Sequence, residues 1–163
     1  MSNIKKIVAA GVIGALYATL TLVLQPFSFG PVQLRLSEAL CVLPFLYPFT
    51  AWGLFAGCLV SNIVGGFGLP DIIFGSLATL AAGLVTARIR VKWLAPLPPV
   101  VVNALVIGGV LAFALAPENP SAAYLLFAAE VGAGQLAACY AVGLPLLLCV
   151  ERLIKKSALP SGR

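Results

Sequence analysis

Long apolar runs fill most of this 163-residue chain, and short segments rich in proline, glycine or charge separate them. A helix needs about 20 predominantly apolar residues to cross a bilayer. Only 9% of the residues are charged, whereas soluble domains carry roughly 25%. Because so few charged residues cannot cover a soluble surface, the sequence predicts an all-α integral membrane protein with a single membrane domain.

We expect six transmembrane helices. The apolar region from residue 36 to residue 64 is longer than one crossing, and Pro44 and Pro48 interrupt it. Proline lacks a backbone donor and disfavours helix in the residue before it, so we divide this region into two helices. The expected helices cover residues 7–24, 36–47, 49–64, 71–90, 98–116 and 122–150 of one domain, residues 1–163.

Basic residues form three clusters, and each cluster lies at the end of an apolar run. The clusters are Lys5 and Lys6; Arg88, Arg90 and Lys92; and Arg152, Lys155 and Lys156. With six helices all three clusters lie on one side of the membrane, whereas with five the middle cluster would lie on the other side. The positive-inside rule therefore favours six helices with both termini in the cytoplasm, and it explains the clusters better than nucleic-acid binding does.

Polar residues gather near the expected outer ends of the helices. Four of the five acidic residues, Glu38, Asp71, Glu118 and Glu130, lie in or beside the outer loops. Ionisable residues near the membrane are costly and usually face a cavity or a partner. With their polar neighbours they predict a substrate-binding set: Arg35, Glu38, Asn62, Asp71, Glu130 and Gln135.

Some of these residues also have purely structural interpretations. Arg35 and Glu38 are three positions apart, so they would form a local ion pair worth a few tenths of a kcal/mol (about 0.2–0.5). Asp71 starts a helix, where a carboxylate complements the helix dipole. Glu118 lies in a PENP turn that we expect to face solvent, whereas Glu130 has no cation near it in the sequence and is the best single candidate.

Nothing in the sequence indicates an enzyme. The chain has no histidine, its four cysteines match no metal motif, and it contains no nucleotide-binding fingerprint. We therefore expect no catalytic residues, cofactor or metal, and we interpret the cysteines as small residues that pack in apolar surroundings. Asn103 is interpreted as the donor or acceptor of an interhelical hydrogen bond.

Small residues recur every four positions along the first expected helix, at Ala10, Gly14 and Ala18. This spacing lets two helix backbones approach closely in lipid. The stripe has two interpretations: it packs inside this chain's own helix bundle, or it forms a docking face for another membrane subunit.

The segments YATLTLVLQPFSFGPVQLRLSEAL, GLFAGCLVSNIVGGFGLPDIIFGSLATL and VGAGQLAACYAVGLPLLL resemble the queuosine-precursor transporter family, QueT type, over about residues 10–152. The resemblance implies the S component of an energy-coupling factor (ECF) transporter, a multi-pass protein of the bacterial plasma membrane. Such a subunit captures its ligand, here a 7-deazaguanine base, from outside. It also implies partners, namely a transmembrane coupling subunit and two cytoplasmic ATPases, with Ala10, Gly14 and Ala18 as the docking surface.

The chemistry of the candidate residues suits such a ligand. A guanine-like edge presents adjacent N–H donors to one carboxylate and a carbonyl to an amide or arginine. An aminomethyl group would add a cation that needs a second carboxylate. An S component for another vitamin or small heterocycle remains the main alternative. A channel or structural helix bundle is less favoured, because a pore should carry polar residues at several depths.

Overall fold

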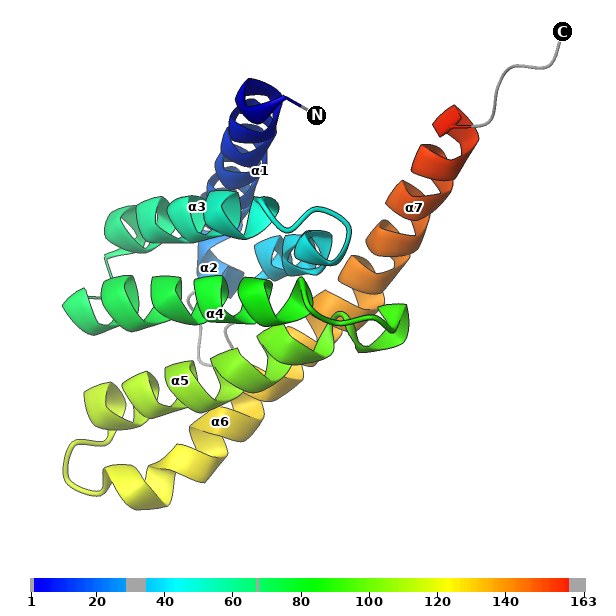
Figure 1. Ribbon diagram of the computed structural model, residues 1–163. Helices are drawn as coiled ribbons and strands as arrows, with labels where there is room; N and C mark the ends of the chain where they lie inside the picture. The colour runs from blue at the N-terminus through cyan, green and yellow to red at the C-terminus, as the bar shows by residue number, and fades with distance from the viewer. Residues whose placement is uncertain (1, 29–34, 67, 159–163) are drawn as a thin grey trace, which may run out of the picture.

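The computed structural model describes residues 2–28, 35–66 and 68–158, and within these ranges the chain forms helices and no strand (Figure 1). The first half consists of α1 (Asn3–Val23), α2 (Gln25–Ser28), η1 (Leu36–Phe45), α3 (Thr50–Gly65), η2 (Asp71–Gly75) and α4 (Ser76–Thr86). The second half consists of η3 (Lys92–Leu94), α5 (Leu97–Leu115), α6 (Pro120–Leu136), η4 (Ala137–Gly143) and α7 (Leu144–Ala158). Here η1 and η3 are 3₁₀ helices, and η2 and η4 are π-helical.

The all-α membrane architecture expected from the sequence is confirmed. In the described part of the chain, three helical runs are long and apolar enough to cross a membrane: Asn3–Val23, Lys92–Leu115 and Pro120–Lys156. Three shorter apolar helices accompany them: Leu36–Phe45, Thr50–Gly65 and Asp71–Thr86. These six correspond to the six expected helices, while the number of crossings and the cytoplasmic position of the termini stay predictions.

The second helix departs most from its expected form. It is a 3₁₀ helix that ends at Phe45, whereas we expected residues 36–47. A 3₁₀ helix rises about 2.0 Å per residue, more than an α-helix. Pro44 lies inside it, and the missing N–H of this proline disfavours a continuous α-helix at that point.

Two other boundaries differ from expectation. The fourth helix ends at Thr86, so the basic segment that we had included up to residue 90 lies outside it. The last helical run extends from Pro120 to Ala158 without a break, beyond the expected residues 122–150. The π-helical turn of η4 lies in the middle of this run.

Glycine brings α1 and α3 into backbone contact. A Cβ atom on Gly53 would lie 2.1 Å from the carbonyl oxygen of Ala10, and a Cβ on Gly57 would lie 2.3 Å from that of Gly14. Such distances leave no room for any side chain, which is how small residues join helices in lipid. Ala10 and Gly14 therefore contact α3 within the bundle, as the first interpretation requires, while the docking role of the stripe stays a prediction.

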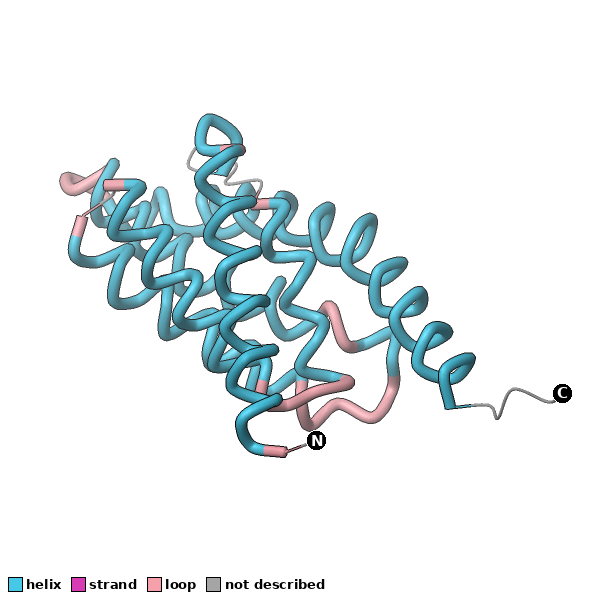
Figure 2. The backbone as a smooth tube through the Cα atoms, turned by 90° about the horizontal axis from the view of Figure 1, so that it is seen from above, coloured by secondary structure: helices cyan, strands magenta, loops and turns pink. Residues whose placement is uncertain are grey.

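The remaining helices continue this packing in sequence order. α3, α4, α5 and α6 lie side by side in a row, with α1 against α3 (Figure 1). η1 crosses near the centre, where it contacts α1, α4 and η4. The connecting segments gather mainly toward two ends of the bundle, and the N-terminus lies beside one of these groups (Figure 2). The two halves of the chain therefore meet mainly at two places, between α4 and α5 and where η1 contacts η4.

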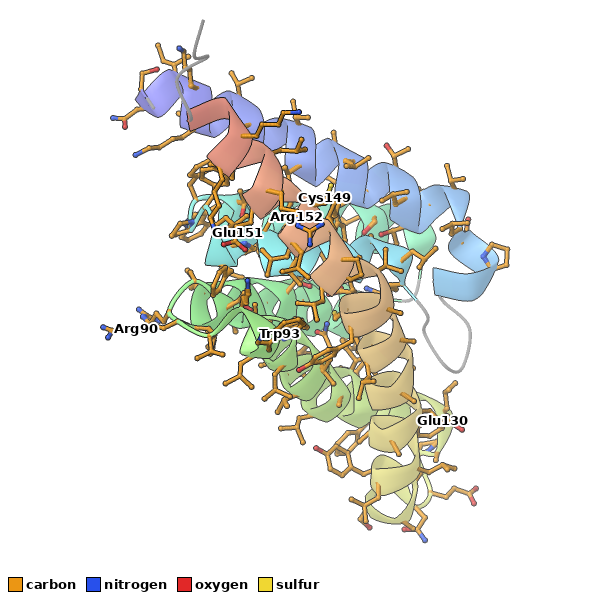
Figure 3. The ribbon with its side chains drawn as sticks, turned by 90° about the vertical axis from the view of Figure 1, so that its right-hand side faces the viewer. Arg90, Trp93, Glu130, Cys149, Glu151 and Arg152 are labelled. Atoms are coloured by element: carbon orange, nitrogen blue, oxygen red, sulfur yellow. The ribbon has the colours of Figure 1, made fainter. Side chains whose placement is uncertain are left out.

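The middle and last basic clusters lie close together in the structure. Figure 3 shows Arg90 and Glu130 at opposite edges of the molecule. The Lys92 ammonium lies 3.6 Å from the Glu151 carboxylate, which joins the middle cluster to the last one. A common end for these charges is what the predicted topology requires.

Candidate functional site

Arg35, Asn62 and Asp71 form a buried polar cluster at the junction of three elements. Arg35 immediately precedes η1, Asn62 lies in the last turn of α3, and Asp71 begins η2. Arg35 Nη1 donates to Asn62 Oδ1 at 3.1 Å, and Arg35 Nη2 donates to Asp71 Oδ2 at 3.2 Å. Asn62 Nδ2 donates to the Asp71 carbonyl oxygen at 3.0 Å. Each residue is at most 3% exposed, so a full ion pair is withdrawn from solvent.

One oxygen of this cluster has no hydrogen-bond donor. Asp71 Oδ1 is buried and accepts no hydrogen bond from any described residue. The Ser76 hydroxyl, one π-helical turn further along, is in the same situation. An unsatisfied buried polar atom is costly and calls for an explanation. Asp71 does begin a helix, as its structural interpretation requires, and it also has an acceptor atom available for a ligand N–H.

Glu38 forms the centre of a second buried cluster, and it is only 1% exposed. One carboxylate oxygen accepts from the Tyr17 hydroxyl of α1. The other accepts from the Cys41 thiol at 3.1 Å and from Asn103 Nδ2 of α5 at 3.2 Å. The expected interhelical hydrogen bond of Asn103 is thereby confirmed.

The structure gives Arg35 and Glu38 separate partners, although the two residues are close in sequence. The side chain of Arg35 reaches α3 and η2, whereas that of Glu38 reaches α1 and α5. A hydrogen bond of 3.0 Å from the Glu38 N–H to the Arg35 carbonyl oxygen joins the two clusters through the backbone. Arg35 and Glu38 are therefore not each other's main partners, although their spacing in the sequence suggested a local ion pair.

Gln135 belongs to the same region of the bundle. It is 3% exposed, and its Oε1 lies 3.7 Å from the Cys139 thiol. The same thiol lies 3.5 Å from the Glu38 carbonyl oxygen. Five of the six expected site residues are therefore connected: Arg35, Glu38, Asn62, Asp71 and Gln135.

A comparison with protein families assigns the chain. The family described as "QueT transporter" matches residues 7–152. The chain belongs to the QueT transporter family. A curated relative, the "Queuosine precursor transporter QueT" of Lactococcus lactis subsp. cremoris (strain MG1363), is 37% identical over 76 residues. That match spans 45% of this chain and 44% of the relative, and no solved structure matches the chain.

Glu130 lies apart from the connected polar residues of this QueT-family chain. It is partly exposed on α6, and it makes no hydrogen bond or ion pair with any residue that the structure describes. Glu118 is exposed in the turn before α6, as expected. The role of Glu130 as a ligand contact stays a prediction.

Sequence reasoning missed the part that α1 plays in the candidate site. Tyr17 and Thr21 are fully buried and bind Glu38 and Ser37, with 2.6 Å between the hydroxyls of Thr21 and Ser37. Their spacing of four residues places both side chains on one face of a helix. Two hydroxyl residues at that spacing within an apolar run were the signal that could have identified them.

The cysteines combine two roles. Cys41, Cys58 and Cys139 are buried and free, as expected for small residues that pack in the core, while Cys149 is exposed. The buried thiols also take part in the polar clusters, since Cys58 Sγ accepts from the Thr79 hydroxyl at 3.3 Å and from Asn62 Nδ2 at 3.5 Å. In the described ranges no three metal-ligating side chains come together.

Proposed function

We propose that this protein is the substrate-binding S component of an ECF transporter, which captures a 7-deazaguanine precursor of queuosine in its 7-aminomethyl or 7-cyano form. It would act at the outer face of a bacterial plasma membrane, which the ligand then crosses by ATP-driven uptake. Membership of the QueT transporter family supports this proposal. The structural observation that carries it is the buried Asp71 carboxylate, which has one oxygen held by Arg35 and one without a donor.

The donors and acceptors of this cluster complement a deazaguanine base. The base presents two adjacent N–H donors, and a carboxylate oxygen free of other bonds is the acceptor they need. Its carbonyl oxygen needs a donor, and Arg35 carries five N–H groups in a planar fork. Glu130 would form an ion pair with the ammonium of an aminomethyl group, because it is a carboxylate without an ion-pair partner among the described residues.

The proposed partners are a transmembrane coupling subunit and two cytoplasmic ATPases. The sequence contains no phosphate-binding loop, so ATP-driven uptake requires subunits other than this chain. A groove of about 350 Å³ runs between α1 and α3, and small residues line most of it, including Ala10, Gly14 and Ala18. Such a surface admits another helix at short distance, and we propose that the coupling subunit docks there.

Calorimetric titration of the purified protein tests the ligand class. We expect the 7-aminomethyl and 7-cyano deazaguanines to bind, guanine to bind more weakly, and vitamins such as thiamine or riboflavin to give no heat. Binding of a vitamin in place of the deazaguanines would favour the alternative, an S component for another heterocycle. An absence of binding by every compound would contradict an S component of either kind.

The same titration tests Glu130 against a matched control. Glu130→Gln keeps the size of the side chain but replaces an acceptor with a donor. Hydrogen bonds to charged groups contribute about 1.5–3 kcal/mol, so we expect affinity for the 7-aminomethyl ligand to fall at least about tenfold. Glu118→Gln removes an exposed carboxylate nearby and should leave affinity unchanged. Equal, near-native affinities of both variants would remove Glu130 from the site.

Docking is tested best at Gly11. A Cβ on Gly11 would meet nothing within 4 Å, although Gly11 lines the groove, whereas a Cβ on Gly14 would lie 2.5 Å from the Gly53 carbonyl oxygen. Gly11→Leu should therefore fill the groove without disturbing the fold. We expect it to abolish uptake into cells that contain the ATPase subunits while ligand affinity stays normal. Normal uptake by Gly11→Leu would show that the coupling subunit docks elsewhere.

A further inference from the structure

A polar cleft lies at the basic end of the bundle, away from the candidate ligand site. It measures about 430 Å³ and is lined by Phe45, Arg90, Val91, Lys92, Trp93 and Glu151. The segment between α4 and α5 contributes four of these residues, while η1 and α7 contribute the other two. In Figure 3 Arg90 extends at the edge of the molecule, with Trp93 and Glu151 closer to its middle. Three charged and three apolar side chains therefore line the cleft.

The charges of this cleft favour an anion. The carboxylate of Glu151 is already engaged, at 2.7 Å from the Lys155 ammonium and at 3.6 Å from that of Lys92. Arg90, in contrast, forms no ion pair with any described residue and is exposed. Since two cations share one carboxylate and Arg90 remains uncompensated, the cleft attracts negative charge.

The position of the tryptophans indicates the depth of the cleft in the membrane. Tryptophan concentrates where the hydrocarbon meets the lipid head groups. Both tryptophans of the chain lie at the basic end, Trp93 next to Lys92 and Trp52 in a surface cleft with Lys6. They are 56% and 59% exposed, which suits rings that face lipid. The anions present at this depth are the phosphates of phospholipids.

We propose that this cleft binds the head group of an anionic phospholipid, with its phosphate between Arg90 and Lys92 and its acyl chains along Trp93. Basic pockets at this depth are suited to anionic head groups. Lysine and arginine supply the donors that a phosphodiester needs, and Trp93 supplies apolar surface for the first carbons of the acyl chains.

Tryptophan fluorescence tests the site directly. In a Trp52→Phe background Trp93 is the only tryptophan, and we would reconstitute this protein into vesicles of phosphatidylcholine with increasing dibrominated phosphatidylglycerol. Bromine quenches a nearby ring, so we expect Trp93 to be quenched at a lower fraction of brominated phosphatidylglycerol than of brominated phosphatidylcholine. Arg90→Gln/Lys92→Gln should reduce this preference about tenfold, because each basic side chain near the surface contributes to anion binding.

The matched control removes the same charge from the same end. Lys5→Gln/Lys6→Gln should leave the preference of Trp93 unchanged, and Arg90→Lys should retain it. An equal loss in both double variants would mean a general attraction of the surface and no discrete site. The absence of any preference would overturn the proposal, as would relief of quenching by millimolar inorganic phosphate, since the occupant would then be a free ion.

Discussion

Arg35→Met is expected to destabilise the fold by about 3–5 kcal/mol, because it leaves a buried carboxylate without its cation. Arg35 and Asp71 are each 3% exposed, and their charged atoms are 3.2 Å apart. Removing the cation also leaves Asn62 Oδ1 without the donor that reaches it at 3.1 Å. The measurement is the free energy of unfolding in mixed detergent micelles, for example by titration with dodecyl sulfate.

A double variant separates the stability that the ion pair contributes from the cost of leaving the Asp71 carboxylate buried without a cation. Arg35→Met/Asp71→Asn removes both charges, so it should recover a large part of the stability that Arg35→Met loses. Lys155→Met is the surface control: it breaks the ion pair between Lys155, which is 72% exposed, and Glu151. Exposed pairs contribute little, so this variant should unfold like the parent. If Arg35→Met also unfolds like the parent, the buried pair does not hold these elements together.

Gly53→Ala is expected to have the second large effect, a destabilisation of at least about 1–3 kcal/mol, the usual range for overpacking. The added Cβ would lie 2.1 Å from the Ala10 carbonyl oxygen and 2.8 Å from its carbon, so α1 must move away from α3. Backbone atoms cannot rotate aside as the end of a side chain can. Because Tyr17 and Thr21 of α1 bind Glu38 and Ser37, the displacement should extend to the second polar cluster.

Gly11→Ala is the matched control for this change. It adds the same methyl group to the same helix pair, but at a position where nothing lies within 4 Å. Replacing glycine with alanine inside a helix is itself mildly stabilising, so Gly11→Ala should unfold at the same or a slightly higher denaturant concentration. Equal stability of the two variants would show that α1 and α3 are not in backbone contact.

The sequence by itself determined the class of the protein and the positions of its helices. Hydropathy and the prolines near Phe45 are local properties, and lipid requires the backbone hydrogen bonds of each crossing to be satisfied within its own segment. For that reason all six helices were placed, although the 3₁₀ form of η1 and the π-helical turns of η2 and η4 were not. The candidate residues Arg35, Asn62 and Asp71 could be named because charged and amide groups are rare in such a chain.

Only the tertiary structure decided which of these residues meet. Glu38 receives its donors from Tyr17, 21 positions before it, and from Asn103, 65 positions after it. Arg35 donates hydrogen bonds to Asn62 and Asp71, 27 and 36 positions away, although Glu38 is much closer along the chain. These pairings depend on how closely α1, α3 and α5 approach η1, and the glycines that set the distance between α1 and α3 are themselves compatible with several arrangements. A pairwise contact between helices is a property of their packing, so no periodicity within one segment can specify it.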